Sequence, residues 1–185
     1  MIDAALDCFA QYGVSKTTVE DVATAAGCSR ATLYRYFPGK QALLDGVLAA
    51  EVDRVARRLD AAARDAATLE DALVALMREA ATEFSGHQAL NHVLNVEPEV
   101  VLPHLAFDPC NRLLSSGAAV VAPSLERFLP PGEALGAAEW VTRVTFTYLF
   151  SPSEHVSLTD EASVRRLVRT YVLPGLEQSV AVPAA

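Results

Sequence analysis

The stretch TTVEDVATAAGCSRATLYRYFPGKQALL, residues 17–44, decides the fold of this chain. Thr18 offers an N-cap hydroxyl followed by two acids, which predicts a helix from there to Gly27. Ser29 can cap a short third helix, which a Pro-Gly pair ends, and a long helix is predicted to begin near Lys40. Together with an amphipathic first helix upstream, the stretch therefore predicts three short helices and the start of a fourth.

The second and third helices of this stretch meet the physical requirements of a helix-turn-helix. Ala23 is small enough to lie where two steeply crossed helices touch, and Gly27 tolerates the positive φ of a tight turn. Apolar residues stand where the pair must pack together, at Val22, Ala26, Cys28, Leu33 and Phe37. The outer face of the third helix is left with hydrogen-bond donors and aromatic rings, which a hydrophobic core does not need.

Charge is distributed unevenly along the sequence. The net charge is −8, which argues against a protein that binds nucleic acid over its whole surface. Between Val22 and Leu44, however, there is no acid, whereas Arg30, Arg35 and Lys40 all lie there. From residue 48 onward, 11 arginines face 18 acids. The pattern suits contact with a polyanion by one end of the molecule only.

Helical periodicity continues to the C-terminal region, and no alternating pattern predicts a strand. Helices are expected over about 68–84, after Asp108, over 133–150 and over 160–173, with less regular pieces in 85–107. The fold class is therefore predicted to be all-α. We expect a helix-turn-helix domain over 1–47, a larger helical domain over 48–177 and a flexible tail over 178–185.

Residues 2–48 closely resemble the DNA-binding region of the TetR/AcrR family of one-component repressors. The specific elements are the Ala-Gly-x-Ser turn, the Thr-Leu-Tyr-x-x-Phe helix and the lysine that opens the next helix. The resemblance implies a DNA-binding transcriptional regulator, most often a repressor that a small molecule releases from a palindromic operator. It also implies a basic arm before the first helix, and this sequence starts almost inside that helix.

The resemblance also implies roles for residues that match its motif. Arg30, Ala31 and Thr32 occupy positions that face base edges, and an arginine there can bond guanine bidentately. Tyr34, Tyr36 and Lys40 match positions that hold the DNA backbone, and Thr18 matches a phosphate contact. The role of Arg35 is open between base, phosphate and solvent. The full predicted DNA-binding set is Thr18, Ser29, Arg30, Ala31, Thr32, Tyr34, Arg35, Tyr36 and Lys40.

In this family the last two helices form a four-helix dimer interface and the middle of the larger domain holds a ligand. The predicted dimer residues are Val141, Val144, Leu149, Val164, Leu167, Val168 and Tyr171. The alternative is that the apolar faces of these two helices pack inside one subunit. The predicted ligand-binding residues are Phe84, Asn91, Leu94, Asn95, His104, Phe107, Leu114, Trp140, Arg143 and Phe146. Because apolar side chains predominate over charged ones, an apolar or amphipathic ligand is expected.

Other functions find less support in the sequence. His87 and His92 are five residues apart, so a continuous helix does not place them on one face as metal ligands, and no metal or cofactor is expected. No nucleophile, base and orienting group form an enzyme signature. No run is long and apolar enough to span a membrane, so a cytoplasmic location is expected. The alternatives left open are a regulator without a small-molecule ligand and a helical enzyme or carrier.

Overall fold

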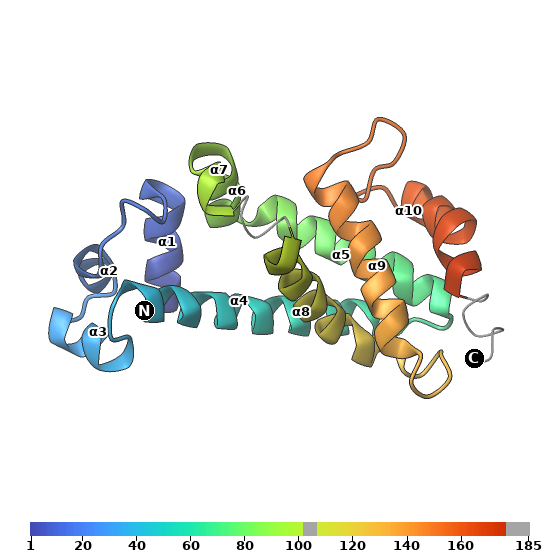
Figure 1. Cartoon of the computed structure of the whole chain (residues 1–185), viewed down its shortest axis with the longest axis horizontal. Helices are drawn as coiled ribbons and strands as arrows, with labels where there is room; N and C mark the ends of the chain where they lie inside the picture. The colour runs from blue at the N-terminus through green and yellow to red at the C-terminus, as the bar shows by residue number, and fades with distance from the viewer. Residues whose placement is uncertain (102–106, 177–185) are drawn as a thin grey trace. The chain divides into compact units, whose positions relative to one another are not determined.

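The computed structural model describes the backbone of residues 1–101 and 107–176, and side chains for 1–99, 111 and 113–176. In these residues the chain is helical, with no strand, as the sequence predicts (Figure 1). The helices are α1 (Ile2–Tyr12), α2 (Val19–Ala25), α3 (Arg30–Tyr36), α4 (Lys40–Ala63), α5 (Leu69–Gly86), α6 (Gln88–Val96), α7 (Pro98–Val101), α8 (Phe107–Leu125), α9 (Ala134–Phe150) and α10 (Glu161–Leu167). A π-helical turn, η2 (Val168–Val172), extends α10, and helix resumes over 173–176.

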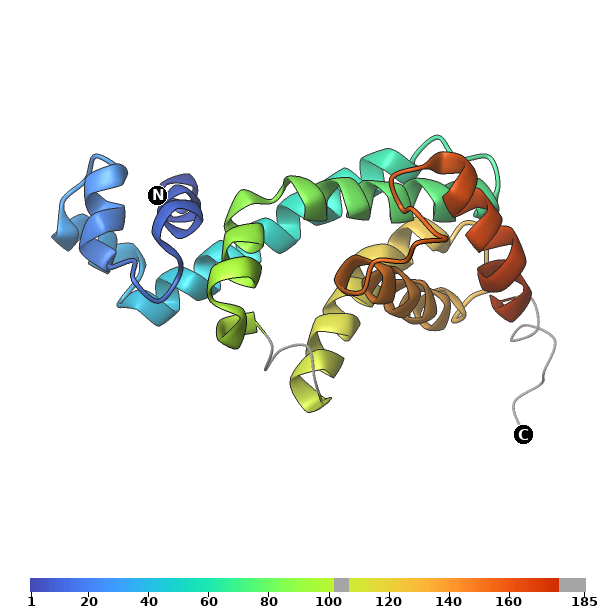
Figure 2. The same ribbon diagram turned by 90° about the horizontal axis from the view of Figure 1, so that it is seen from above.

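The described residues form two compact units. The first takes residues 1–54 and 85–101, and the second takes 55–84 and 107–176. This division differs from the sequence-predicted boundary after residue 47. The difference arises because α6, which was expected in the larger domain, packs on α1 (Figure 2). The predicted tail over 178–185 lies outside the described residues.

The first unit is built around the helix-turn-helix. Its core joins Phe9 of α1, Val22 of α2, Leu33 of α3 and Leu43 of α4, all at most 3% exposed. Ala89 of α6 is buried against the same cluster. Burying one such large apolar side chain contributes about 1.5–3 kcal/mol. This shared core attaches α3, a helix of 7 residues with an exposed polar face, to the rest of the unit.

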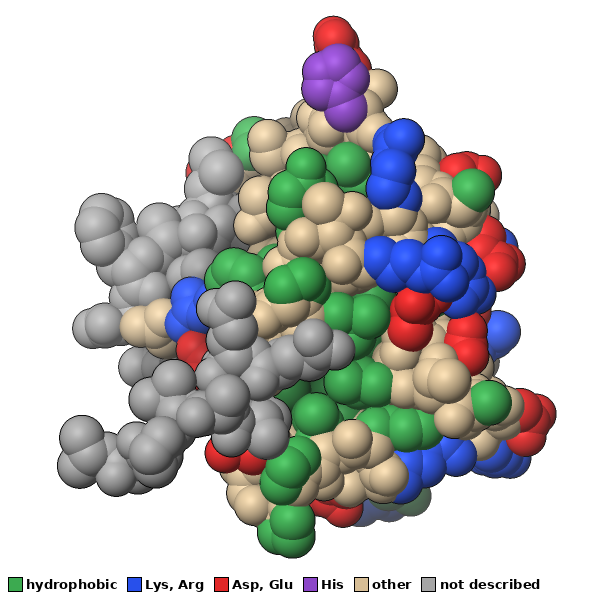
Figure 3. Space-filling view, turned by 90° about the vertical axis from the view of Figure 1, so that its right-hand side faces the viewer, with side chains coloured by type: hydrophobic (Ala, Val, Ile, Leu, Met, Phe, Trp, Pro, Cys, Tyr) green, Lys and Arg blue, Asp and Glu red, His purple; other side chains and the backbone are tan. Residues whose placement is uncertain are grey.

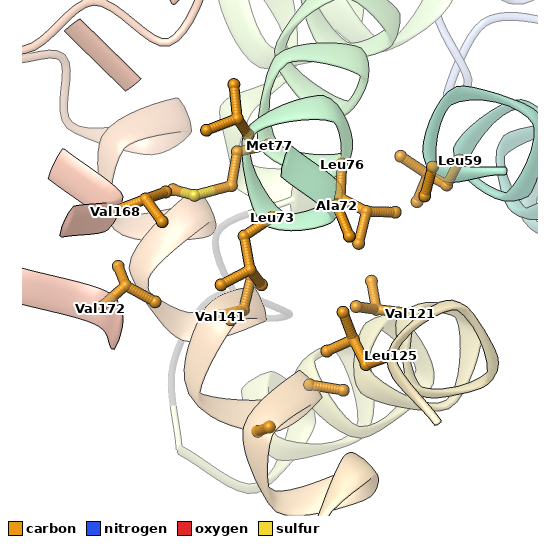
Figure 4. Close-up of a cluster of buried hydrophobic side chains, with 14 of the residues drawn as sticks. Leu59, Ala72, Leu73, Leu76, Met77, Val121, Leu125, Val141, Val168 and Val172 are labelled. Atoms are coloured by element: carbon orange, nitrogen blue, oxygen red, sulfur yellow. The ribbon is translucent and has the colours of Figure 1, made fainter. Parts of the chain in front are cut away.

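The second unit has a larger core in which α5 is central (Figure 4). On one side of α5, Leu73 and Met77 face Val141 of α9 and the η2 valines Val168 and Val172. On another side, Ala72 and Leu76 face Val121 and Leu125 of α8 and Leu59 of α4. The neighbouring helices α8 and α9 also pack closely on each other. α5 therefore serves as the axis on which the other helices of this unit pack.

No helix in the described part of the chain is both long and apolar enough to cross a membrane. Within the same residues, no three His, Cys, Asp or Glu side chains gather as ligands for a metal ion.

Candidate DNA-binding surface

The turn between α2 and α3 has the geometry that the sequence predicts. Gly27 adopts φ +64°, a conformation that side-chain-bearing residues rarely adopt. The amide of Cys28 donates to the carbonyl of Ala23 at 3.0 Å, and Ala23 itself is 3% exposed. The small residue and the glycine together allow the two helices to cross closely, which confirms the predicted positive φ at Gly27.

The first turn of α2 is held by a reciprocal cap between Thr18 and Asp21. The Asp21 amide donates to Thr18 Oγ1 at 3.2 Å, and Asp21 Oδ2 accepts the Thr18 amide at 2.8 Å and the Thr18 hydroxyl at 2.6 Å. These bonds from the Thr18 hydroxyl and amide hold the pKa of Asp21 below its ordinary value. The single hydroxyl hydrogen of Thr18 is thus used inside the protein. A phosphate contact by Thr18 would require this hydrogen to turn away from Asp21, because phosphate oxygens only accept.

The start of α3 is capped by Ser29. Its hydroxyl accepts the Thr32 amide at 3.1 Å and lies 2.9 Å from the Thr32 hydroxyl. The cap leaves the first residues of α3, Arg30 and Ala31, on the surface. Thr32 is partly buried beside Ser29, so its methyl and hydroxyl have less freedom than those of a fully exposed threonine.

The outer face of α3 pairs each arginine with a tyrosine. The Arg30 guanidinium lies 5.2 Å from the centre of the Tyr34 ring, and Arg35 lies 5.3 Å from that of Tyr36. Arg30 also reaches Glu20 of α2 at 3.5 Å, a long and solvent-exposed ion pair of little net strength. Because both arginines are held above flat rings and remain exposed, their donors are available to an incoming anion.

Lys40, the first residue of α4, lies on the same unit but is not free. Its Nζ donates to the Ser15 carbonyl, in the turn between α1 and α2, at 2.8 Å. An ammonium group has three donors, so two remain for a phosphate oxygen. The contact places the charge of Lys40 beside the turn that leads into Thr18.

The predicted ligand-binding residues are only partly brought together. In the second unit, Phe84 of α5 and Phe146 of α9 both pack edge-on against Phe150, at 5.2 and 5.7 Å between ring centres. Leu114 of α8 is buried, whereas Trp140 is 45% exposed. Arg143 is exposed and bonds Glu139 one turn away.

The remaining predicted ligand residues belong to the first unit or lie outside the description. Asn91 donates to the Ser85 carbonyl at 2.8 Å, Asn95 donates to the Asn91 carbonyl at 2.7 Å, and Leu94 is half-buried. These amides therefore serve to shape α6. His104 and the side chain of Phe107 lie outside the described residues.

Three features of the second unit were missed at the sequence level. Phe150 completes the aromatic trio, and its spacing of four from Phe146 on one helix was a usable signal. The Thr142 hydroxyl is buried without a hydrogen-bond partner among the described residues. Gly117 of α8 approaches it so closely that an added Cβ would lie 2.8 Å from Thr142 Cγ2. Neither of these last two has a sequence signature.

Most of the predicted dimer residues are buried within one chain. Val141, Val164, Leu167 and Val168 are at most 3% exposed and lie in the core of the second unit. Val144 and Leu149 are packed against the same core, and Tyr171 alone of the set is well exposed, at 69%. The periodic stripes thus pack within one chain, because the apolar face of α9 and α10 is already covered by α5 and α8. Of this set, Tyr171 is the residue most accessible to a second copy.

A shallow hollow of about 350 Å³ lies on α10 and is lined by Ala162, Arg165, Arg166, Arg169 and Thr170. None of the predicted ligand-binding residues lines it. Two of its arginines are engaged with α5: Arg165 bonds Glu70 and Asp71 at 2.7 and 2.8 Å, and Arg169 bonds Glu70 at 2.7 Å. Its charge is therefore largely used to attach α10 to α5.

A helix-turn-helix unit that exposes a short helix carrying arginine and tyrosine side chains is typical of DNA-binding proteins. The comparisons agree with this class. Residues 1–47 match the family of bacterial regulatory proteins named for TetR. An uncharacterised HTH-type transcriptional regulator of Mycobacterium tuberculosis is 27% identical over 177 residues, covering 94% of this chain and 82% of the relative.

Solved structures share the fold over nearly the whole chain. The TetR-family repressor AlkX from a Dietzia species, implicated in biodegradation of n-alkanes, gives a TM-score of 0.68 at 22% identity, covering 96% of this chain and 93% of AlkX. The regulator FadR of Bacillus subtilis, solved in complex with stearoyl-CoA, gives 0.62 at 18% identity, covering 91% and 96%. Residues 1–47 are thus similar to the DNA-binding region of TetR-family regulators, and the rest of the chain shares the fold of these solved structures.

Proposed function

We propose that this regulator is a homodimeric repressor that reads a palindromic operator with α3 and is released by an apolar or amphipathic ligand. The observation that carries the proposal is the exposed face of α3, where Arg30 and Arg35 are held above tyrosine rings. One such helix reads only a few base pairs, whereas two helices spaced about 34–36 Å apart read a palindrome on one side of the duplex. Thr18, Ser29, Ala31 and Lys40 would complete the contact surface.

The second unit supports an apolar ligand. Phe84, Phe146 and Phe150 form an aromatic wall from α5 and α9, and the unpaired Thr142 hydroxyl offers a polar group close to Gly117 of α8. A buried hydroxyl without a partner gains when a ligand bonds it. That FadR was solved with stearoyl-CoA, and that AlkX is implicated in n-alkane degradation, supports a ligand with a long hydrocarbon chain. The ligand would release DNA to the extent that it binds the DNA-free form better.

The homodimer is proposed on a revised face. Leu135 and Trp140 of α9 and Tyr171 of η2 are large apolar residues that are 58%, 45% and 69% exposed. Figure 3 shows hydrophobic side chains exposed at this end of the second unit, with basic and acidic side chains to one side of them. Aromatic and aliphatic side chains flanked by charges are typical of an interface with a polar rim.

The proposal is tested by footprinting on the DNA upstream of the gene, with stearoyl-CoA, stearic acid and a panel of strongly polar metabolites as probes. We expect one protected palindrome, which the compounds with a hydrocarbon chain release while raising the melting temperature of the protein. If no palindrome is protected with any probe present, repression by this route is wrong. If DNA binds but only polar metabolites release it, or none does, the ligand class is wrong and a regulator without such a ligand takes its place.

A further inference from the structure

A buried carboxylate holds the turn between α1 and α2. Glu97 follows the last residue of α6 and is 6% exposed. Its two oxygens accept the backbone N–H of Ser15 at 3.2 and 3.3 Å. The carboxylate lies against Gly13, where an added Cβ would come within 2.7 Å of it. The turn and the acid therefore fit each other closely, although they are 82 residues apart.

The charge of Glu97 is retained despite its burial. Burial alone raises the pKa of Glu97, but hydrogen bonds from Ser15 and from the Val14 amide, with the charge of His92, hold the pKa below its ordinary value. An ionised carboxylate is costly to bury unless donors surround it. Because the donors include the backbone amides of Ser15 and Val14, the path of the turn stabilises the carboxylate.

The same turn positions two parts of the DNA-binding surface. The Ser15 carbonyl accepts a hydrogen bond from the Nζ of Lys40. Ser15 is therefore held through its amide by Glu97 and through its carbonyl by Lys40. Thr17, 2% exposed, donates its hydroxyl to the Gly13 carbonyl at 2.6 Å, and the next residue is the cap of α2. The path of the backbone from Gly13 to Thr18 thus sets both Lys40 and the first turn of α2.

We propose that Glu97 is a positioning residue for DNA binding, acting through the α1–α2 turn on Lys40 and on the start of α2 without touching DNA. The inference rests on the proposed DNA-binding function and is independent of the proposed repression and ligand. The loss of a charge-assisted hydrogen bond to a buried group corresponds to roughly a tenfold or larger change in an equilibrium that depends on it.

The test uses the full chain and a duplex that the unaltered protein selects from a randomised pool. We expect Glu97→Ala to speed hydrogen exchange of the Ser15 amide, to weaken duplex binding about tenfold and to lower the salt slope by about one phosphate contact. Exchange of the α3 amides should not change. Glu99→Ala is the matched control, because it removes an exposed acid two residues away. It should leave the Ser15 amide and the salt slope as they are.

Two further variants decide the outcome. Glu97→Ala could unfold residues 1–47, which would be seen as lost protection of the α3 amides. In that case Glu97→Gln replaces it, because the side-chain carbonyl of glutamine can still accept one bond from Ser15. Glu97→Gln should bind DNA with an affinity between those of the unaltered protein and Glu97→Ala. Combining Glu97→Ala with Lys40→Ala should cost less than the sum of the two, since both act on one contact. Unchanged affinity and slope in Glu97→Gln would overturn the proposal, as would a strictly additive double variant or an equal loss in Glu99→Ala.

Discussion

At the scale of single residues, the hydrogen-bond donors of the proposed DNA-binding face differ in how strongly they already contact other protein groups. Arg30 and Arg35 are held above tyrosine rings, the Thr18 hydroxyl donates to Asp21, and Lys40 donates to Ser15. Arg30 makes only long, exposed contacts with Glu20 and the Tyr34 hydroxyl, both at 3.5 Å, whereas Thr18 has to exchange a short bond to Asp21 for one to a phosphate. We infer that the two arginines bind DNA first, and that a contact between Thr18 and a phosphate breaks the bond from the Thr18 hydroxyl to Asp21.

Lys40→Ala should weaken binding to all duplex sequences alike, because a lysine near the backbone contributes charge without reading bases. Its loss should lower the slope of log K against log salt by about one. The measurement is fluorescence anisotropy over a range of salt concentrations. Arg64→Ala is the control, since Arg64 is an exposed cation paired with Asp60 in the second unit. An unchanged slope in Lys40→Ala would show that Lys40 does not contact phosphate.

At the scale of the elements, two local features hold helices together: the tight turn between α2 and α3, and the ionic contact that attaches α10 to α5. Gly27 enables the first through its positive φ. In the second, Arg165 bonds Glu70, Asp71 and Glu161 together. Each of these features fixes one helix against another, which helix propensity alone does not do.

Gly27→Ala should destabilise the protein by about 1–2 kcal/mol, because a side chain in the left-handed region is strained even with open space around it. Gly136→Ala should instead stabilise it by about 0.5–1 kcal/mol, because Gly136 lies within α9 and nothing is near its added Cβ. Chemical unfolding monitored by circular dichroism measures both. Equal effects of the two variants would contradict the assigned turn.

The ionic contact between α10 and α5 should make stability depend on pH below the ordinary range of carboxyl groups. Hydrogen bonds from Arg169 and Arg165 lower the pKa of Glu70, and those from Arg165 and Thr68 lower the pKa of Asp71. Their stabilisation is present above the ordinary pKa and is lost as pH falls through the lowered one. We therefore expect melting temperatures of the unaltered protein and of Arg165→Gln to converge as pH falls through about 4 and below. A constant difference down to pH 2 would contradict this.

The sequence predicted the helices and the turn between α2 and α3 because both follow from local rules. Capping residues, the glycine and helical spacing all act within a few neighbours, and Thr18, Gly27 and Ser29 show them directly. The contacts of Glu97 with Ser15 and of α6 with α1 join segments far apart in the chain, and nothing near Glu97 indicates them. The apolar stripes of α9 and α10 were read as a dimer face, but periodicity does not distinguish an intramolecular partner from a second copy.

At the scale of the whole molecule, charge and exposed apolar surface are divided between the parts. Residues 1–47 hold four Lys or Arg and five acids, whereas the rest carries a large excess of acid. The acids disfavour contact of the larger domain with DNA, so DNA binding is directed to residues 1–47. Leu135, Trp140 and Tyr171 remain exposed in the second unit, where a second copy would cover them.

Leu135→Glu should shift the protein from dimer toward monomer, because it places a charge in an apolar contact. Sedimentation equilibrium measures the mass, and fluorescence of the single tryptophan, Trp140, should shift to the red as the ring becomes more hydrated. Leu48→Glu is the matched control, since Leu48 is similarly exposed but lies in the first unit. A dimer unaffected by Leu135→Glu would show that copies meet elsewhere.

The central claim, that α3 reads DNA through its exposed arginine face, is tested most directly by selecting duplexes from a randomised pool with the unaltered protein and with Arg30→Ala. We expect the unaltered protein to enrich a palindrome with a guanine at a fixed place in each half-site. Arg30→Ala should lose that guanine preference and bind about 1–3 kcal/mol more weakly, while the remaining positions persist. Enrichment of the same sequence with the same strength by both proteins would contradict the account.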